Sequence, residues 1–581
     1  MNIKRITLAI LIFCTLESCA GKDIETQEKP KLNRISLTEE TGVKLQNFFS
    51  QEASYQRFSG VALVESNDSI VYKQTLGKAT SSGNRNDNLR FEIGSITKQF
   101  TAAAILQLVQ HEKLALSDNI NLHLGSLSSK EWKKVTVHQL LTHTSGIPSI
   151  YQTEQGLEIF FPEEAAISLA DLVNRFKDHS LLFSPGEEFS YSNSGYVLLA
   201  AIIEEKTGMT YHEYLEKNIF DKYGLESTSF TREGNTTEPF YEYRADLSKR
   251  APIYHPSWSF GAGGAYSTVE DLARWAKLIQ SDSFLTENLR KEFLKSHTRQ
   301  GYGYGWQFDK SGRIQHDGGT AGYMSFLSID PSQKTVVVLL TNQGFEDIHT
   351  YGKSARYLSD VLAKTWNILS NEEVEVLPEI VKTNFQKKRS YRLDDKIKID
   401  FTPGTDTSVV VSVDGSLVTR ILPSTPLKAS AVLEEKMLAI GERLHNSDYW
   451  KLAKYCDGEM KFVCYSGLMR IGMKMMKKQT GKITETVPYF AAENHGLIRM
   501  IGEDGTLDMI VYFNDANEVQ GIFEYASIGG IAGGEMIAYP IGENRFFVDG
   551  HPYGEPSCEI TIQANKLTIS QLGREVVATE Q

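Results

Sequence analysis

Cysteine is scarce in this chain of 581 residues, and the few cysteines are spread unevenly. Of the five present, Cys14 and Cys19 lie in the first twenty residues, and Cys456, Cys464 and Cys558 lie in the last third. Three irregularly spaced thiols make neither a disulfide framework nor a zinc cage, although a single disulfide stays open. The length, with 41% hydrophobic and 23% charged residues, predicts a globular protein of two or three domains.

Positive charge is also under-represented. The chain carries 61 lysine and arginine residues against 73 aspartate and glutamate residues, a formal net charge of −12, and no basic patch stands out. A protein that binds nucleic acid or a broadly anionic substrate needs a basic footprint, so both classes are disfavoured. We expect a small-molecule or peptide substrate and no nucleic-acid partner. The oligomeric state stays open.

The N-terminus lacks a hydrophobic run long enough to anchor the chain. Residues 1–19 combine a charged start, a short apolar core and a small residue before Cys19, which is typical of a secretory signal. Leu16-Glu-Ser-Cys19 resembles a bacterial lipoprotein cleavage box, which implies that Cys19 is lipidated. Glu17 is unusual there, and a plain signal peptide with release into the periplasm is the alternative. Residues 20–39 would be a polar tether. We expect a cell-envelope protein that contacts the membrane through the lipid anchor only.

Signals for a metal or phosphate site are weak. Residues 135–148 are predicted to form a short helix halted by Gly146 and Pro148. His138 and His143 have the wrong spacing for two ligands on one helical face, and no acidic partner accompanies them. The glycine-rich segment 261–264 lacks the lysine and spacing of a phosphate-binding loop, and it is better explained as the approach to a helix capped by Ser267 or Thr268. We therefore predict no metal and no cofactor.

Strand-forming segments lie at both ends of residues 40–370, with mostly helical sequence between them. Two β-rich runs around a polar turn at residues 55–80 predict an antiparallel hairpin. The fold class we expect is α/β, with an antiparallel sheet flanked by helices plus a helical subdomain. Further strands of the same sheet are predicted at residues 301–306, 316–322, 324–329 and 335–341.

The most informative stretch, residues 91–100, begins a helix beside a candidate nucleophile. Gly94 and Ser95 close a loop, and an alanine- and leucine-rich helical run follows to about residue 111. Ser95 therefore lies at a helix N-terminus, where unpaired N–H groups favour negative charge. Lys98 lies one turn away on the same face. A buried lysine with a lowered pKa can activate a serine, although Ser-x-x-Lys alone also fits a capped helix with an exposed lysine.

Two further motifs complete the Ser95 motif. Tyr191-Ser-Asn193 lies in a turn before an apolar helix predicted at residues 197–206, and His316-Asp-Gly318 lies in the strand-rich part. With Ser95-Ile-Thr-Lys98, they resemble the three motifs of the serine β-lactamase and penicillin-binding-protein superfamily, in the same order. The tyrosine version is similar to the class C branch and its D-aminopeptidase and esterase relatives, and residues 140–148 also look like that branch. The resemblance covers about residues 40–365 and implies a serine β-lactamase-like fold.

The resemblance implies a role in acyl transfer for each matching residue. Ser95 would attack a carbonyl group, while Lys98 and Tyr191 take its proton and later return one to the leaving group; which of the two is the main base stays open. The backbone N–H groups of Ser95 and Gly319 would form the oxyanion hole. No metal is required. Substrate-binding or oxyanion-hole positions are implied for Asn193, His316, Gly318 and Gly319.

His316 departs from the commonest form of the third motif, which carries lysine. A lysine there attracts the carboxylate of β-lactams and of C-terminal D-amino acids, whereas histidine is mostly neutral at pH 7 and offers directed hydrogen bonds. We therefore expect a serine hydrolase that acts on peptide, amide or ester bonds through an acyl-enzyme. A β-lactamase or D,D-peptidase is the alternative among enzymes. A slowly acylating sensor or binding protein is the alternative of another class.

The resemblance stops near residue 370, and residues 371–581 are predicted to be an accessory α+β or β region that binds substrate, shapes the cleft or mediates assembly. Residues 400–423 have the pattern of two strands around Asp414-Gly415. Residues 426–527 carry helical periodicity followed by strands, similar to a nuclear-transport-factor-2-like fold, and would be an insertion in a β-barrel-like module. Further strands are predicted at residues 497–502, 507–514, 519–525, 545–549, 559–564 and 566–571.

Overall fold

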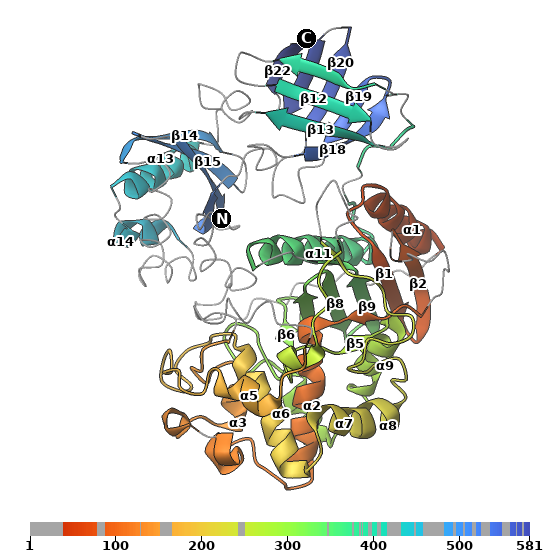
Figure 1. Ribbon diagram of the computed structural model, residues 1–581, viewed down its shortest axis with the longest axis vertical. Coiled ribbons are helices and arrows are strands. Elements are labelled where there is room, and N and C mark those ends of the chain that lie inside the picture. Colours follow the sequence, from red (N-terminus) through yellow and green to blue (C-terminus); the bar gives the residue numbers. More distant parts are fainter. Residues whose placement is uncertain are drawn as a thin grey trace. The chain divides into compact units, whose positions relative to one another are not determined.

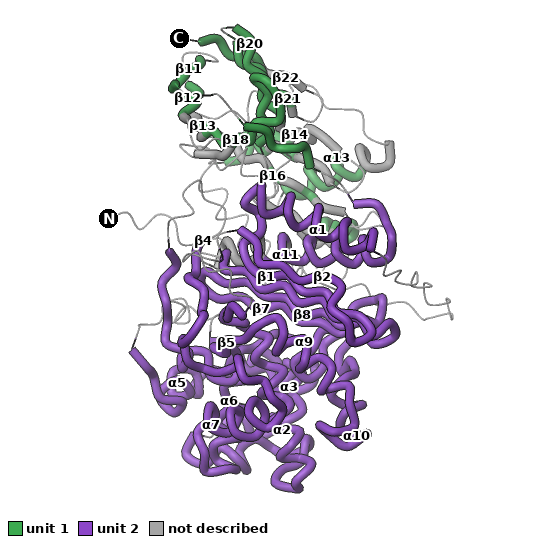
Figure 2. Tube along the Cα trace, turned by 90° about the vertical axis from the view of Figure 1, so that its right-hand side faces the viewer, with its two compact units in different colours: residues 1–19, 243–246, 377–581 green, residues 20–242, 247–376 purple. Residues whose placement is uncertain are grey.

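The computed structural model divides the chain into two compact units (Figures 1 and 2). The first comprises Ala20–Glu242 and Leu247–Val376, and the second comprises Met1–Cys19, Tyr243–Asp246 and Leu377–Gln581. No helix in the described part of the chain is long and apolar enough to cross a membrane. The structure describes residues 39–580 except 78, 80–87, 128, 151–164, 242–249, 345–347, 375–376, 383–384, 386, 393–397, 404–407, 415–430, 447–448, 457–481, 492–494, 504–505, 514–518, 525–534, 549–557, 565 and 572–573.

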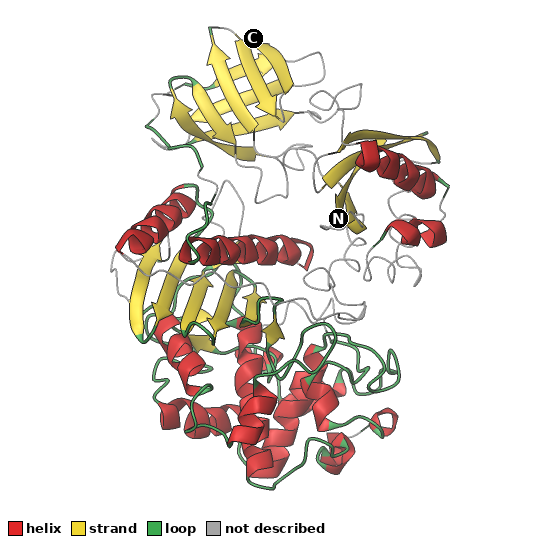
Figure 3. Ribbon diagram, turned by 180° about the vertical axis from the view of Figure 1, so that it is seen from behind, coloured by secondary structure: helices red, strands yellow, loops and turns green. Residues whose placement is uncertain are grey.

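The first unit is built on a six-stranded antiparallel sheet in the order β2-β1-β9-β8-β7-β6. The register pairs Gly60 with Thr341, so the N-terminal hairpin joins the C-terminal strands of the unit in one sheet, as predicted. Every residue of the central strands β1, β8 and β9 is buried, because helices cover both faces (Figure 3). The strands are β1 (Gly60–Ser66), β2 (Ser69–Leu76), β6 (Gln307–Phe308), β7 (Ile314–Thr320), β8 (Tyr323–Asp330) and β9 (Thr335–Thr341).

Helices α1 and α11 lie on one face of this sheet, and α9, α2 and the helical region lie on the other (Figures 1 and 3). The indole N–H of Trp366 on α11 donates to Ser328 Oγ on β8 at 3.2 Å, which ties that helix to the sheet. The helices are α1 (Glu39–Ser54), α2 (Thr97–Gln110), α3 (Val137–Leu141), α5 (Leu169–Asn174), α6 (Asn193–Thr207), α7 (Tyr211–Leu215), α8 (Asp221–Tyr223), α9 (Val269–Leu278), α10 (Glu287–Phe293) and α11 (Ile348–Leu369). Short strands pair as β3 (Phe91–Glu92) with β5 (Tyr266–Ser267) and β4 (Phe240–Tyr241) with β10 (Gln343–Gly344).

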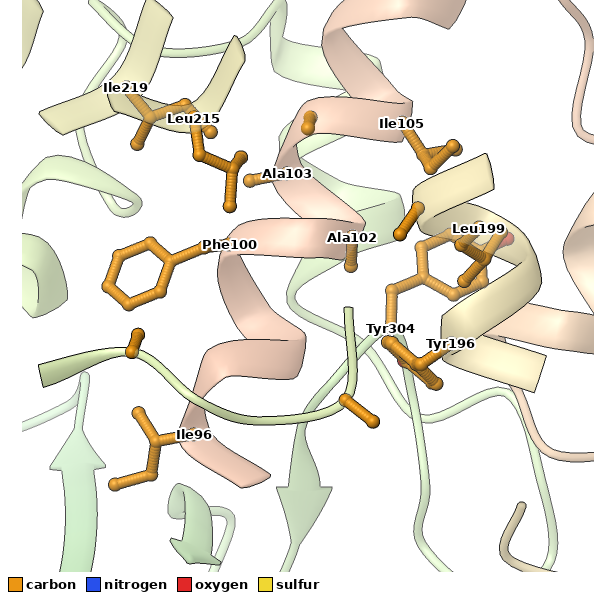
Figure 4. Close-up of a cluster of buried hydrophobic side chains, with 14 of the residues drawn as sticks. Ile96, Phe100, Ala102, Ala103, Ile105, Tyr196, Leu199, Leu215, Ile219 and Tyr304 are labelled. Carbon is orange, nitrogen blue, oxygen red and sulfur yellow. The ribbon is translucent and has the colours of Figure 1, made fainter. Parts of the chain in front are cut away.

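Helix α2 is the centre of the hydrophobic core (Figure 4). Its residues from Thr97 to Leu108 are all buried, so it has no solvent-facing stripe. Phe100 points toward Leu215 and Ile219 on one side, and Tyr196 and Leu199 of α6 lie on the other side. The ring of Phe100 also packs on Trp275 of α9, with 4.6 Å between ring centroids. A helix fixed from all sides gives the residues at its first turn a rigid position.

Three local predictions for the first unit are corrected. Residues 301–306 form turns rather than a strand, and the strand pairing begins at Gln307. The turn fits a segment with glycine at every second position, two of which, Gly301 and Gly305, have φ values of +78° and +77°. Within the predicted helix at residues 135–148, only α3 is helical. The apolar helix α6 begins at Asn193 rather than near residue 197, because Ser192 caps it by accepting from the backbone N–H of Gly195.

The second unit contains a closed eight-stranded barrel in the order β11-β12-β13-β18-β19-β20-β21-β22. Its neighbouring strands pair in antiparallel register, and alternate side chains fill an apolar interior around Phe401. The stretch predicted as the first strand of a hairpin around Asp414-Gly415 is divided into β12 and β13, which pair with each other. β13 ends at Asp414, and the strand predicted after Gly415 lies outside the described residues. The strands are β11 (Arg389–Arg392), β12 (Lys398–Pro403), β13 (Val409–Asp414), β18 (Glu535–Gly542), β19 (Arg545–Val548), β20 (Cys558–Gln563), β21 (Lys566–Gln571) and β22 (Arg574–Glu580).

Between β13 and β18 the chain forms a separate four-stranded antiparallel sheet in the order β14-β15-β16-β17. Helix α13 contacts this sheet: Thr486 Oγ1 on β14 lies 3.3 Å from His445 Nδ1. The nuclear-transport-factor-2-like identity of this segment and the domain boundaries stay predictions. The elements are α13 (Ala431–His445), α14 (Tyr449–Leu452), β14 (Ile483–Ala491), β15 (His495–Gly502), β16 (Thr506–Phe513) and β17 (Val519–Glu524).

The predictions for the N-terminal signal, for Cys19 and for all of the tether but its last residue concern segments outside the described residues. The same holds for two of the three cysteines of the last third, Cys464 and, as a side chain, Cys558. Cys456 is buried, and its thiol donates to the carbonyl oxygen of Leu452 at 3.4 Å.

Candidate active site

Ser95 is held at the start of α2 by a tight turn that packs against β7. Gly94–Ile96 form one 3₁₀ turn that runs directly into α2. Gly94 has a φ of +49°, and a Cβ atom there would lie 2.5 Å from the backbone nitrogen of Gly319. A Cβ atom on Gly318 would lie 2.0 Å from a carbonyl oxygen of the turn and 2.9 Å from the backbone nitrogen of Ser95. Both glycines are therefore needed for β7 to approach the nucleophile this closely.

Lys98 lies one helical turn beyond Ser95 and is fully buried. Its Nζ lies 2.9 Å from Ser95 Oγ, 2.8 Å from Asn193 Oδ1 and 2.8 Å from the carbonyl oxygen of Ala262. Three oxygen atoms around one amine fix its position against the serine hydroxyl. The Ala262 carbonyl comes from the glycine-rich segment, which therefore positions the lysine as well as leading to α9.

The surroundings of Lys98 favour the neutral amine. Burial lowers the pKa of Lys98 well below its usual value, and the nearby charge of Asp317 opposes that shift only in part. A neutral amine has a lone pair, which an ammonium group lacks. Lys98 can therefore accept the proton of Ser95 at 2.9 Å.

Tyr191 and Asn193 flank the residue that caps α6. Asn193 is the first residue of α6, and its backbone N–H and side-chain amide both lie near Ser149 Oγ, at 3.3 and 3.5 Å. The Tyr191 hydroxyl forms a hydrogen bond with Ser95, and the tyrosine ring centroid lies 4.9 Å from Lys98 Nζ. The turn thus delivers a phenol to the nucleophile and an amide oxygen to the lysine.

The phenol of Tyr191 is held in its protonated form. Burial raises the pKa of Tyr191 well above its usual value; the hydrogen bond with Ser95 works in the opposite direction, and the charge of Asp317 raises the pKa further. A protonated phenol donates rather than accepts a proton. The pKa of Lys98 is lowered and that of Tyr191 is raised, so a proton acceptor and a proton donor lie beside the same Ser95 hydroxyl.

His316 is buried on β7 with both ring nitrogens engaged. Its Nδ1 donates to the carbonyl oxygen of Asp317 at 2.6 Å, and its Nε2 lies 3.0 Å from the Tyr302 hydroxyl, from which it accepts. Burial lowers the pKa of His316; Asp317 opposes this shift and Lys98 adds to it. His316 is therefore a neutral group whose directed hydrogen bonds go to the protein itself.

Asp317, the middle residue of the third motif, places a carboxylate at the site. Residues alternate along β7, so that His316 is buried and the Asp317 side chain is 14% exposed. The Oδ1 of Asp317 lies 3.9 Å from His316 Nδ1, and the charge of Asp317 raises the pKa values of Lys98, Tyr191 and His316. The acid in the middle of His-x-Gly was the signal that sequence analysis passed over.

The structure brings the three predicted motifs together around one hydroxyl group. Ser95, Lys98, Tyr191 and Asn193 are in direct contact, and Gly318 and Gly319 lie against the Ser95 turn. Ala262, Tyr302 and His143 border them as well. His143 lies in the segment 140–148 that resembles the same family, whereas no motif in the sequence indicated Ala262 or Tyr302.

His138 and His143 do not share a metal site. Nδ1 of His138 is hydrogen-bonded to the Tyr304 hydroxyl at 2.7 Å, whereas Nδ1 of His143 accepts from the backbone N–H of Ser192 at 3.1 Å. Within the described residues there is no group of three or more side chains suited to holding a metal ion.

The chain belongs to the Beta-lactamase family, whose model matches residues 45–356, more than half of its length. It is 27% identical to penicillin-binding protein 4* of Bacillus subtilis (strain 168), over 52% of this chain and 71% of that protein. It is 26% identical to the putative penicillin-binding protein PbpX of the same organism, over 55% and 79% of the two chains. The chain is thus a β-lactamase-fold member of a serine hydrolase family that includes penicillin-binding-protein relatives.

One solved structure is similar over a longer stretch. The octameric penicillin-binding protein homologue from Pyrococcus abyssi is 21% identical and aligns with a TM-score of 0.50 over 82% of this chain and 97% of that chain. At this identity the likeness concerns the fold alone. It supports the predicted serine β-lactamase-like fold class.

Proposed function

We propose that this protein is a serine hydrolase of the bacterial cell envelope that cleaves peptide, amide or ester bonds through an acyl-enzyme on Ser95. The observation that carries the proposal is the buried Lys98 amine, 2.9 Å from Ser95 Oγ and fixed by two further acceptors. A structural lysine would be expected to pair with a carboxylate or to reach water. This one is aimed at a hydroxyl and is shifted toward its neutral form.

Acylation follows from these contacts. Ser95 Oγ attacks the substrate carbonyl carbon while its proton passes to the neutral Lys98 amine. The oxyanion that forms is stabilised by the backbone N–H groups of Ser95 and Gly319, each of which contributes about 10²–10³-fold in sites of this kind. When the tetrahedral intermediate collapses, the bond to the leaving amine or alcohol breaks, and the Tyr191 hydroxyl supplies the proton that it needs. Lys98 then returns a proton to Tyr191.

Deacylation follows the same steps, with water as the nucleophile. Water replaces the leaving group, loses its proton to the Lys98–Tyr191 pair and attacks the ester carbonyl of the acyl-enzyme. The carbon–oxygen bond to Ser95 breaks, and Ser95 Oγ regains its proton. Asn193, whose Oδ1 accepts from Lys98 at 2.8 Å and whose amide nitrogen donates to Ser149 Oγ at 3.5 Å, keeps its second amide N–H for a substrate carbonyl.

The charges at the site favour substrates without a carboxylate next to the scissile bond. His316 is neutral and hydrogen-bonded to the protein, so it supplies no cation for such a group. Asp317 adds a negative charge that repels it. We therefore place neutral esters and amides ahead of β-lactams and C-terminal D-amino acid peptides, and we keep the assignment to a lipid-anchored envelope protein as part of the proposal.

The test is hydrolysis of a substrate panel by the chain without residues 1–19, with Ser95→Ala beside it. The panel holds a short-chain aryl ester, D-alanyl amide and peptide substrates, and a chromogenic cephalosporin. We expect ester or amide turnover that disappears in Ser95→Ala. Fastest turnover of the cephalosporin would refute the selectivity argument. A stable Ser95 adduct in the intact mass, with no turnover, would identify a sensor instead of a hydrolase.

A further inference from the structure

His143 holds the turn that carries Tyr191 and Asn193 at two points. Its backbone carbonyl oxygen accepts from the N–H of Ser190 at 2.9 Å, and its ring Nδ1 accepts from the N–H of Ser192 at 3.1 Å. The two donors lie on either side of Tyr191. One histidine therefore fixes the backbone on both sides of the residue whose hydroxyl lies beside the nucleophile.

The ring of His143 also packs against Tyr191 itself. The two ring centroids lie 4.2 Å apart with a tilt of 37°, and the ring of Tyr302, whose hydroxyl bonds His316, lies 4.6 Å from the histidine on another side. His143 is 1% exposed. Its position thus determines where the Tyr191 ring can lie.

The hydrogen bond from Ser192 determines the form of the ring. Because Nδ1 accepts, the ring is neutral and carries its proton on Nε2, and Nε2 is buried without a hydrogen-bond partner among the described residues. Burial lowers the pKa of His143 well below its usual value, consistent with the neutral form. A buried polar atom without a partner is unfavourable, so such an atom is found where the residue is retained for another of its interactions.

The backbone at His143 is also unusual. Its φ is +58°, a left-handed conformation that non-glycine residues seldom adopt. A strained backbone and an unpaired ring nitrogen at one residue are both unfavourable to folding. Both are explained if the residue is retained for what its Nδ1 and its ring do to the Tyr191 turn.

We propose that His143 is the positioning residue of the second motif: its Nδ1 and ring hold Tyr191 in the geometry that allows proton transfer at Ser95. The inference rests on the proposed function, because it assigns a partner to the same reaction. It predicts that loss of the Nδ1 acceptor slows acylation while substrate binding changes little.

Three variants of the full chain separate the contributions. His143→Phe keeps a ring against Tyr191 and removes the acceptor. His143→Asn keeps an acceptor close to the position of Nδ1 and tolerates the positive φ. His138→Phe is the matched control, because it removes the buried hydrogen bond of a neighbouring histidine to Tyr304 without touching the Tyr191 turn.

Two rates are measured for each variant: kcat and KM on an aryl ester, and labelling of Ser95 by a fluorophosphonate, followed by intact mass. We expect His143→Phe to lower kcat and the labelling rate about 10- to 100-fold, the range for a buried donor that loses its acceptor, with KM within about threefold. His143→Asn should recover most of this loss, and His138→Phe should keep the wild-type rates. Thermal unfolding of each variant checks that it is folded at the assay temperature.

A double-mutant cycle with Tyr191→Phe gives the decisive result. If His143 acts through Tyr191, His143→Phe slows labelling much less in the Tyr191→Phe background than in the wild type. Equal losses in the two backgrounds would overturn the proposal, as would wild-type rates in His143→Phe or equal losses in His143→Phe and His143→Asn. A wild-type chain that labels at Ser95 without turnover would refute the hydrolase alone, since the labelling rates still decide the role of His143; one that does neither would overturn both.

Discussion

The two interiors of this protein are built from different kinds of residues. Around Ser95 the first unit buries Lys98, His143 and His316, each at most 1% exposed. The interior of the barrel in the second unit is lined by aliphatic and aromatic side chains, and among its described residues the buried polar groups are few: Ser408 and the hydroxyl of Tyr391. Burying polar and ionisable groups is unfavourable to folding, so their concentration in one place marks where function overrides stability. Changes in the first interior should therefore alter chemistry, and changes in the second should alter stability.

The largest effect is expected for Lys98→Met. The variant keeps the length of the side chain but has no amine to accept the proton of Ser95, so we expect acylation to fall about 10⁴-fold or more, as when one member of a catalytic group is lost. Because the amine is already disfavoured in its charged form by burial, the midpoint of thermal unfolding should change little. The measurements are the rate of Ser95 labelling and the unfolding midpoint, with the exposed Lys291→Met as control. A parallel fall in both quantities would remove the contrast between the two interiors.

The opposite outcome is expected for Phe401→Ala at the centre of the barrel. Phe401 is fully buried, and its ring packs against Tyr391 and Phe546, each with 5.9 Å between ring centroids. Loss of a large core side chain typically lowers the free energy of unfolding by about 3–5 kcal/mol. We expect denaturant unfolding to show this loss, while turnover of a small aryl ester stays at the wild-type level. The exposed Val577→Ala, on the same barrel, should change neither; lost ester turnover in Phe401→Ala would show that the barrel acts on the site.

How much of the site could be predicted from sequence depends on how far apart the contacting residues lie along the chain. Ser95 and Lys98 are three residues apart on one helix, so their contact follows from helix geometry alone. The contact of Lys98 with Asn193 and Ala262 joins segments about 95 and 164 residues away, and only the family motifs made the first of these expected. The second depends on the path of a glycine-rich loop, for which no side chain gives a signal.

In the barrel the sequence was informative about strands and uninformative about their connections. The alternation around Ile560 and Ile569 predicted β20 and β21, because each strand buries one face. Closure of the sheet depends on the pairing of β11 with β22, nearly 190 residues apart, which periodicity cannot reveal. The same limit applies to His143: residues 140–148 resembled the family, but the bond of His143 to Ser192 joins positions 49 residues apart, and the sequence did not indicate that contact.

A smaller effect is expected for Asp317→Asn, a change at the active site of the first unit. Asp317 raises the pKa of Lys98 against the effect of burial, so removal of its charge lowers that pKa further. The neutral amine then forms at lower pH, and the acid limb of the kcat/KM profile for a neutral ester should move down by about half a unit to one unit. Turnover of carboxylate-bearing substrates should rise several-fold relative to the ester. An acid limb that moves upward, or that moves equally in Glu287→Gln, would contradict the placement of this charge.

The smallest effect is expected at the surface of the barrel, at Asp400. Burial raises the pKa of Asp400, but hydrogen bonds from Lys388, Ser390 and Lys398 outweigh it and bring the pKa to about 2, below the ordinary 3.8. A lowered carboxyl pKa stabilises the folded state above the unfolded pKa, and this contribution is lost as the pH falls toward 2.

Asp400→Asn should therefore lower the free energy of unfolding at pH 7 by about 1 kcal/mol, the upper range for a solvent-screened ion pair. The difference from the wild type should persist down to about pH 4 and then shrink. Denaturant unfolding from pH 7 to pH 3 measures it, with Glu559→Gln, which breaks one exposed pair with Arg545, as the matched control. Because this charge has exposed partners and no reaction to serve, ester turnover should be unchanged; a loss of turnover here would mean that the chemistry extends beyond the residues around Ser95.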